Sequence, residues 1–392
     1  MLSAGLAPWP SFGEDEQAAV AEVLRSGRVN YWTGEETRAF EREFAAYVGT
    51  AKAVAVANGT LALDLALRGL GIGPGDEVIV TPRTFIASVS CVVNAGATPV
   101  FADVDRDSGN ISPATIAAVL TERTRAIIPV HLAGWPCDMP GILALTEPRG
   151  IAVIEDCAQA HGARIGGRSV GSFGAVGAWS FCQDKIISTG GEGGMVTTSD
   201  EALWDRMWSF KDHGKSWDAV YNREHAPGFR WLHDSIGTNW RMLEIQSAIG
   251  RIQLRKLGDW QARRLAIANR YRAALNPLEA AVRAPWPESN MTHACYRFYA
   301  YVRPEGLRPG WSRDRIVAEA TARGAPLFQG SCSEVYREKA FDNTPWRPLQ
   351  RLPAAAELGD TSLMFLTHPT LTDDEVEWIC IQAAAVLREA AA

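Results

Sequence analysis

One lysine stands in a stretch whose neighbours favour chemistry over an ordinary surface position. Lys185 lies in "WSFCQDKIISTGGEGGM", residues 179–195, between a short apolar segment typical of a strand and a loop with four glycines. Most lysines are solvated surface residues. Glycines let a ligand approach the backbone closely, although a glycine-rich loop by itself is weak evidence for a ligand. The role of Lys185 therefore depends on what other segments bring to it.

Two other turns carry polar residues directly after apolar, strand-like segments. Asn58, Gly59 and Thr60 follow "KAVAVA", residues 52–57, and open a helical pattern. Free N–H groups at such a helix start can bind phosphate, but this turn alone favours a simpler role for the polar residue as a helix cap. Asp156 ends "IAVIED", residues 151–156. Its carboxylate can pair with a cationic ring nitrogen, or it can cap the segment that follows.

Taken together, these pieces meet the requirements of pyridoxal 5'-phosphate. The lysine carries this cofactor covalently, an acid such as Asp156 keeps the pyridine nitrogen protonated, and backbone amides hold the phosphate. A nucleotide-binding P-loop does not match, because the glycines follow Lys185 instead of leading up to G-K-[ST].

Helical and strand-like segments alternate along the first two thirds of the chain. Runs such as "EVIVTP", "TRAIIPVHL" and "IAVIED" are continuous in Val and Ile, with helical patterns between them. This predicts an α/β fold with a mainly parallel sheet covered on both faces. Near Leu254 this alternation gives way to a long basic helical pattern. We therefore expect a large domain at 1–258 and a smaller C-terminal domain at 259–392.

Composition excludes several classes of function. The 392 residues carry a net charge of −6, which disfavours nucleic acid as a partner. No segment reads as a signal peptide or a membrane span. The seven cysteines are scattered and never form C-x-x-C, and the seven histidines are scattered too. We therefore expect no disulfide framework and no metal site, and the cytoplasm as the compartment.

The chain resembles the DegT/DnrJ/EryC1/StrS family of sugar aminotransferases, which have the type I fold of aspartate aminotransferase. The resemblance runs nearly end to end and is carried by several motifs in order. They include "VNYWTGEETRAFEREFAAYVG" at 29–49, "VIEDCAQAHGARIGGRSVGSFGAVGAWSF" at 153–181, "KIISTGGEGGMV" at 185–196 and "GTNWRMLEIQSAIGRIQL" at 237–254.

The resemblance implies a role for each matching residue. Lys185 would carry the cofactor and then move the proton between substrate and cofactor carbons. Asp156 would face the pyridine nitrogen, Gln159 the ring hydroxyl or the back of the ring, and Phe85 the ring face. Without the resemblance, Phe85 reads as a core residue. The phosphate would be bound by Gly59, Thr60 and Ser180, with Asn58 beside them.

A further motif implies a shared site. Asn239 and Arg241 in "GTNWRM" match the segment that reaches the phosphate region of the neighbouring subunit, which predicts a homodimer, with Arg241 near the substrate. Glu192 is expected to fix its loop. His131, His161 and His213 are expected to be structural or to lie behind the site.

This chain departs from the family pattern at two places. Asn58 stands where the family often has serine, which leaves the backbone donors intact. Cys182, Gln183 and Asp184 replace the usual residues before the lysine, and their roles are open, as is that of "GSCSEVYREKAF" at 330–341. Some relatives have histidine at the lysine position and are dehydratases, so Lys185 indicates a transaminase.

The predicted activity is transfer of an amino group from glutamate to a nucleotide-linked keto sugar, in amino-sugar biosynthesis for a surface polysaccharide or a secondary metabolite. Two alternatives stay open. One is amination of a keto-cyclitol, and the other is a cofactor-binding regulator without turnover.

Overall fold

A seven-stranded sheet forms the centre of the protein, for which a computed structural model describes residues 5–392. Its strand order is β1-β9-β8-β5-β4-β2-β3, and every strand runs parallel to the others except β9. The predicted α/β fold with a mainly parallel sheet is confirmed. The strands are β1 (Lys52–Val56), β2 (Glu77–Val80), β3 (Thr98–Phe101), β4 (Thr124–Ile128), β5 (Ala152–Asp156), β8 (Val176–Ser180) and β9 (Gly194–Thr198).

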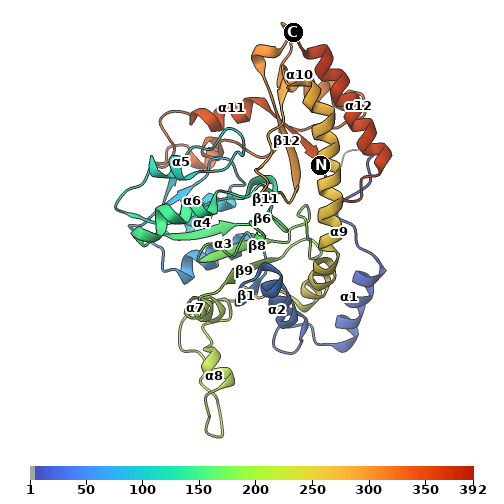
Figure 1. Ribbon diagram of the computed structural model, residues 1–392. Helices are drawn as coiled ribbons and strands as arrows, with labels where there is room; N and C mark the ends of the chain where they lie inside the picture. The colour runs from blue at the N-terminus through green and yellow to red at the C-terminus, as the bar shows by residue number, and fades with distance from the viewer. Residues whose placement is uncertain (1–4) are drawn as a thin grey trace.

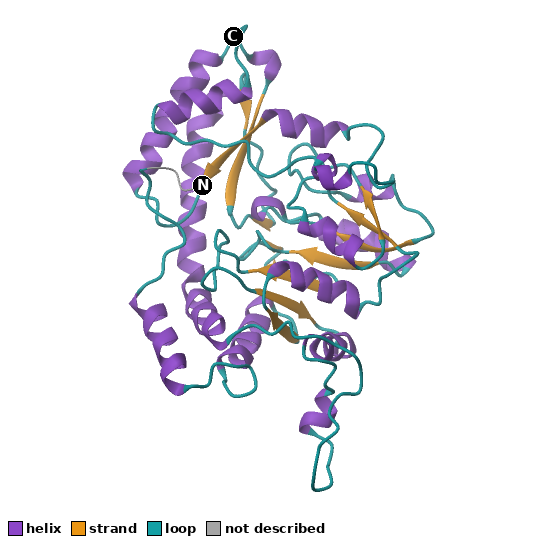
Figure 2. Cartoon of the chain, turned by 180° about the vertical axis from the view of Figure 1, so that it is seen from behind, coloured by secondary structure: helices purple, strands orange, loops and turns teal. Residues whose placement is uncertain are grey.

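Both faces of this sheet are buried, which explains the continuous apolar runs in its strands. Val54 and Val56 of β1 pack into the core beneath α3 (Gly59–Gly69) and α7 (Glu201–Lys211). Ala53 and Ala55 point the other way, into the core that α2 (Glu36–Val48) covers with its phenylalanines. Figures 1 and 2 show helices on both sides of the sheet.

The remaining helices surround this sheet and continue into the C-terminal part. They are α1 (Glu14–Ser26), α4 (Ala87–Asn94), α5 (Pro113–Ala117), α6 (Met139–Thr146), α8 (Trp217–Tyr221), α9 (Glu244–Leu275), α10 (Arg313–Ala322), α11 (Pro353–Thr361) and α12 (Asp373–Ala390).

The C-terminal part has its own small sheet and core. The sheet has the order β10-β12-β13, with β10 (Val282–Arg283), β12 (Arg297–Val302) and β13 (Ser362–Leu366). Its core includes Tyr271, Phe298 and Phe365 and is closed by α10 and α12. A third sheet joins the short strands β6 (Arg164–Ile165), β7 (Arg168–Ser169) and β11 (Met291–Thr292).

Helix α9 connects the two parts. Figure 1 shows it running beside the large sheet and on to the small one. The domain boundary expected at Gly258 falls inside this continuous helix of 32 residues, and the division into 1–258 and 259–392 stays a prediction.

An arm, residues 214–238, leaves the body of the protein and carries α8 (Figure 1). Phe229, Trp231 and Ile236 in this arm are exposed. Across residues 5–392, no helix is both long enough and apolar enough to cross a membrane.

Candidate active site

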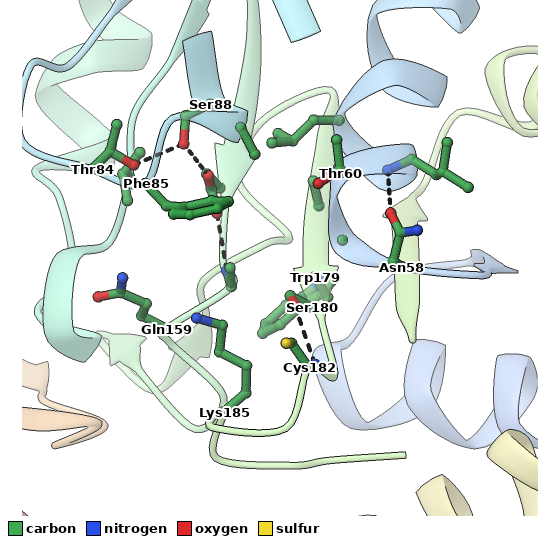
Figure 3. Close-up of a pocket in the computed structure, with 18 of the residues that line it drawn as sticks. Asn58, Thr60, Thr84, Phe85, Ser88, Gln159, Trp179, Ser180, Cys182 and Lys185 are labelled. Carbon is green, nitrogen blue, oxygen red and sulfur yellow. Dashed lines mark hydrogen bonds between the residues drawn. The ribbon is translucent and has the colours of Figure 1, made fainter. Parts of the chain in front are cut away.

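The carboxyl ends of β1, β8, β5 and β2 meet at one edge of the sheet, because these strands are parallel. A cavity of about 640 Å³ opens there, a size typical of small-molecule sites. Figure 3 shows side chains from these turns around it. The lining residues include Asn58, Gly59, Thr60, Thr84, Phe85, Ser88, Asp156, Gln159, Ser180, Cys182, Asp184, Lys185 and Glu192.

Lys185 lies in the loop after β8, and neighbouring contacts hold its backbone. Its N–H donates to the carbonyl of Cys182 at 3.1 Å, and its carbonyl accepts from the indole of Trp9 at 2.9 Å. Ile186 and Ile187, which follow it, are fully buried. The side chain is then free to reach into the cavity, where Figure 3 shows its amine beside Gln159.

The amine of Lys185 is not an ordinary surface ammonium. Its side chain is mostly buried, and its Nζ lies 3.4 Å from Asp184 Oδ1. Burial acts to lower the pKa of Lys185, but Tyr296 and Asp184 outweigh it, and the net shift raises this pKa above its usual value. The free lysine is therefore held as an ammonium at neutral pH.

The start of α3 forms an anion cradle. The side chain of Asn58 caps the helix by accepting from the N–H of Leu61 at 3.0 Å, so its capping role is confirmed. The N–H groups of Gly59 and Thr60 have no acceptor within the helix, because they belong to its first turn. A Cβ at position 59 would lie 2.5 Å from Ser180 Cβ. Only glycine at position 59 therefore lets the start of this helix lie so close to Ser180. The N–H groups of Gly59 and Thr60 and the Ser180 hydroxyl are three donors that can bind one phosphate.

Asp156 is a buried carboxylate with donors on both oxygens. The hydroxyl of Ser88 donates to Oδ2 at 2.7 Å, and the N–H of Ala158 donates to Oδ1 at 3.1 Å. Burial raises the pKa of Asp156, and these two donors oppose the shift. Both of these donors are neutral, and a protonated ring nitrogen beside Asp156 would give its carboxylate a positively charged partner.

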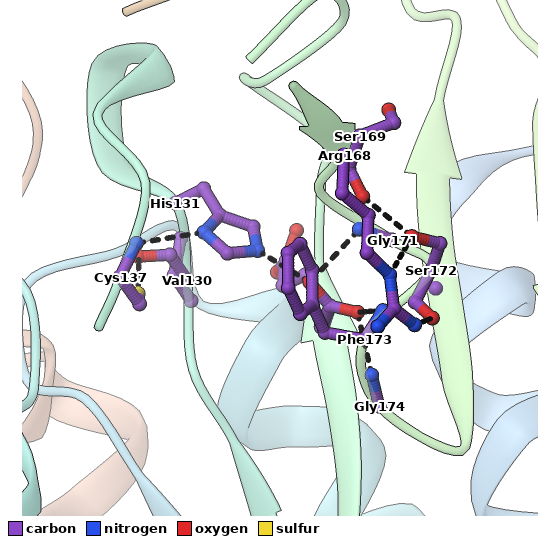
Figure 4. Close-up of polar contacts among 12 residues, drawn as sticks. Val130, His131, Cys137, Arg168, Ser169, Gly171, Ser172, Phe173 and Gly174 are labelled. Carbon is purple, nitrogen blue, oxygen red and sulfur yellow. Dashed lines mark hydrogen bonds and ion pairs between the residues drawn. The ribbon is translucent and has the colours of Figure 1, made fainter. Parts of the chain in front are cut away.

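Glu155, the residue before Asp156 on β5, is fully buried and points to the opposite face of the strand. Figure 4 shows the residues that contact it, His131, Gly171, Phe173 and Gly174. Glu155 accepts from the N–H groups of Gly171 at 2.8 Å and of Phe173 and Gly174 at 2.7 Å. Its Oε2 also lies 3.1 Å from His131 Nε2. These contacts tie a loop and a histidine to the residue next to Asp156, so His131 is a structural residue of the site.

Cys157 lies beside this pair, and the three side chains together have the residue types of a metal site. The hydrogen bonds of these side chains do not favour metal binding. Four donors already saturate Glu155, Nδ1 of His131 accepts from the N–H of Cys137 at 2.9 Å, and burial raises the pKa of the Cys157 thiol well above its usual value.

Phe85 and Gln159 complete the wall. Phe85 is 68% exposed, so its interpretation as a core residue is wrong, and its ring is free to cover a flat ligand. The amide oxygen of Gln159 accepts from the N–H of Ala133 at 2.7 Å, which fixes the orientation of this side chain. The segment 330–341 packs beside Phe85, since the carbonyl of Cys332 accepts from the N–H of Thr84 at 3.1 Å.

Asn239 and Arg241 do not line the cavity of their own chain. The guanidinium of Arg241 lies 2.8 Å from Asp212, and the N–H of Arg241 donates to the side chain of Asn239 at 3.4 Å. Both residues follow the arm, whereas the cavity wall comes from the strand ends.

The structure also brings residues to the site that the sequence analysis missed. Ser88 and Thr84 form a hydroxyl chain to Asp156, with their oxygens 2.8 Å apart. Tyr296 lies close to Lys185 from the C-terminal part, with Nζ 5.2 Å from its ring centre. No local signal marks these residues, because serine and threonine are common in turns and Tyr296 is far away in sequence.

The three groups that pyridoxal phosphate requires thus surround one cavity. The cradle suits a phosphate, Asp156 suits a protonated ring nitrogen, and Lys185 carries the amine for covalent attachment. A surface role for Lys185 or a capping role for Asn58 would not explain why these three groups lie around the same cavity.

Comparison with known proteins agrees with this geometry. The chain is 41% identical over 374 residues to the spore coat polysaccharide biosynthesis protein SpsC of Bacillus subtilis, covering 94% of this chain and 93% of SpsC. It is 36% identical to the GDP-perosamine synthase of Escherichia coli O157:H7, covering 95% of each. Among solved structures, an aminotransferase from Psychrobacter cryohalolentis superposes with a TM-score of 0.97 at 59% identity, covering 98% of this chain and 99% of the other.

DesV of Streptomyces venezuelae superposes with a TM-score of 0.84 at 35% identity, covering 95% of this chain and 94% of DesV. The profile of the DegT/DnrJ/EryC1/StrS aminotransferase family matches residues 10–383. The chain therefore belongs to the DegT/DnrJ/EryC1/StrS aminotransferase family and is a pyridoxal-phosphate-dependent aminotransferase.

Proposed function

We propose that this enzyme transfers the amino group of L-glutamate to a keto sugar that is linked to a nucleotide. The observation that carries the proposal is the similarity, over nearly the whole chain, to proteins named for amino-sugar chemistry. Besides the two relatives above, a UDP-N-acetyl-3-dehydro-α-D-glucosamine 3-aminotransferase of Acidithiobacillus ferrooxidans is 44% identical over 343 residues, covering 88% of this chain and 86% of the other. The cavity of about 640 Å³ has room for a cofactor and a sugar ring.

We further propose roles for the residues of this chain. Pyridoxal phosphate, when bound, supplies the electron sink that transamination needs. Asp156 holds a proton on the ring nitrogen, and the start of α3 with Ser180 anchors the phosphate. Lys185, once its amine is released, moves the proton at the reacting carbon as a general base and then a general acid.

The charge of the cavity supports a site shared between two subunits. Among residues 5–392, its ionisable lining consists of the carboxylates of Asp156, Asp184 and Glu192, the thiol of Cys182 and one amine, that of Lys185. Cofactor phosphate, glutamate and a nucleotide are all anions, so such a wall needs cations from elsewhere. Asn239 and Arg241 follow the arm with its exposed apolar residues, and we propose that in a twofold dimer they reach the partner's cavity.

Mixed dimers test the shared site. Lys185→Ala and Asn239→Ala are each expected to be nearly inactive as homodimers. After subunit exchange in equal amounts, half of the dimers are mixed, and each mixed dimer has one site without a defect, so about a quarter of all sites should regain activity. If activity stays flat after exchange has been demonstrated by mass spectrometry, both residues serve the same subunit and the shared site is refuted.

The acceptor is identified by a single-turnover experiment. The enzyme is first converted with glutamate to its amino form and then mixed with a panel of nucleotide-linked keto sugars and keto-cyclitols. Return of the aldehyde-form absorbance with a nucleotide-linked sugar supports the proposal. Return with a cyclitol alone supports the alternative acceptor, and no conversion by glutamate or any other amino donor would favour a regulator without turnover.

The proposed compartment is the cytoplasm. All seven cysteines are free thiols, and five of them are buried, an arrangement that a reducing compartment preserves.

A further inference from the structure

Asp184, the residue before Lys185, is part of a charged cluster in the cavity wall. Its Oδ1 lies 3.4 Å from Lys185 Nζ. Its Oδ2 accepts a hydrogen bond from the hydroxyl of Tyr296 and lies 3.9 Å from a guanidinium nitrogen of Arg297. One carboxylate thus faces the amine with one oxygen and two groups of the C-terminal part with the other.

The partners of Asp184 are firmly held. Tyr296 is buried, and its N–H donates to the carbonyl of Ala133 at 2.9 Å. Its own carbonyl accepts from the hydroxyl of Thr367 at 3.0 Å. Arg297 begins β12, the middle strand of the small sheet. The phenol of Tyr296 is therefore a fixed hydrogen-bond donor, and it fixes the position of the negatively charged Asp184 carboxylate.

This charge is present at neutral pH. Burial acts to raise the pKa of Asp184, but Lys185, Tyr296 and Arg297 outweigh it and hold this pKa below its usual value. Asp184 is about half exposed, so its attraction for the amine is partly screened by solvent.

The other ionisable groups around the amine do not replace Asp184. Burial raises the pKa of Cys182, and burial lowers the pKa of His161 to about 3, so both are neutral at pH 7. The carboxylate of Asp156 is engaged by Ser88 and Ala158. Glu192, which also lines the cavity, has the thiol of Cys182 3.8 Å from its Oε1. Asp184 is the carboxylate placed against Lys185 Nζ within the described residues 5–392.

We propose that Asp184 is a positioning residue that holds the freed amine of Lys185 as an ammonium against Tyr296 and so decides at which pH this lysine becomes a base. The proposal rests on the role of Lys185 proposed above. A neighbouring carboxylate favours the charged form of an amine. When the lysine is released from the cofactor, Asp184 keeps it in place, and the amine must lose one proton to solvent or substrate before it acts as a base.

The test titrates Lys185 in the enzyme stripped of cofactor. Acetic anhydride labels the free amine, and mass spectrometry of the peptide around residue 185 measures the labelling rate as a function of pH. Asp184→Asn removes the charge but keeps the shape, so the labelling rate of Lys185 at neutral pH should rise roughly tenfold and its titration should move to lower pH.

Three further variants sharpen the result. Asp184→Glu restores the charge and should return the titration toward that of the wild type. Tyr296→Phe leaves the carboxylate charged but frees it from its donor, so it should change the titration less than Asp184→Asn. Asp314→Asn is the control: it removes an exposed carboxylate that pairs with Arg313 and not with Lys185. It should leave the titration of Lys185 unchanged.

The holoenzyme gives an independent measurement. In Asp184→Asn the acid limb of the pH profile for the half-reaction with glutamate should move to lower pH, with little change in KM. Identical labelling curves in Asp184→Asn and wild type would overturn the proposal. Attachment of the cofactor to another lysine would instead refute the catalytic role of Lys185, while the labelling result at residue 185 would still stand by itself.

Discussion

Replacing Lys185 by alanine is expected to reduce turnover at least about 10⁴-fold, because it removes both the covalent anchor and the group that moves the proton. The purified wild-type protein should be yellow, and borohydride should fix its cofactor to residue 185. The variant should lose this reducible linkage while its fold remains, since the side chain makes no contact that the core requires. Absorbance spectra and peptide mapping after reduction measure both effects.

Lys256→Ala is a matched control for this experiment. Lys256 lies on α9, where it pairs with Asp15 and Glu16, away from the cavity. Its loss should leave the colour, the reducible linkage and turnover unchanged. Finding the cofactor on any lysine other than 185 would show that the site has been assigned to the wrong residue.

Asp156→Asn is expected to lower turnover roughly 10²- to 10³-fold while cofactor binding partly survives. Asparagine keeps the shape: its oxygen can still accept from the N–H of Ala158, and its amide nitrogen can donate to the Ser88 hydroxyl, which then donates to Thr84. It lacks the negative charge that keeps a ring nitrogen protonated. Steady-state rates and a cofactor titration followed by absorbance separate the two effects. Wild-type turnover in the variant would refute this role of Asp156.

Thermal unfolding of Asp156→Asn shows whether its lower turnover comes from misfolding. Burial raises the pKa of Asp156 in the folded protein, so the empty protein binds this proton more tightly than the unfolded chain does. Its stability therefore falls as the pH rises from the unfolded pKa to the folded pKa. At neutral pH, Asp156→Asn removes this cost, and thermal unfolding of the cofactor-free variant should occur no earlier than that of the wild type.

Much of the fold followed from local patterns. The strands of the large sheet are buried on both faces, as Val54 and Ala55 on opposite sides of β1 show. Both-sided burial demands continuous apolar runs, and such runs are visible in a sequence without any knowledge of partners. The helix start at Asn58 was also predictable, because the residue that caps a helix lies within three positions of the N–H that it satisfies.

The candidate site was predictable to the extent that parallel strands gather their ends. Asp156 ends a strand, and Gly59 and Lys185 lie after the ends of two others; parallel order brings such strand ends to one edge of a sheet. The order of the strands, with β9 inserted between β1 and β8, was beyond the sequence. Strand order depends on which pairings bury the most surface together, and no single segment encodes that.

The sequence by itself determined the kind of chemistry at this site: a lysine, an acid and a phosphate cradle at the ends of parallel strands. Only the tertiary structure decided what surrounds them. It exposed Phe85 to the cavity, joined Ser88 to Asp156 across 68 residues, and brought Tyr296 to Asp184 across 112 residues. Such contacts leave no periodic trace in a chain, because they arise from the packing of whole elements, and the last of them fixes the carboxylate that lies 3.4 Å from the Lys185 amine.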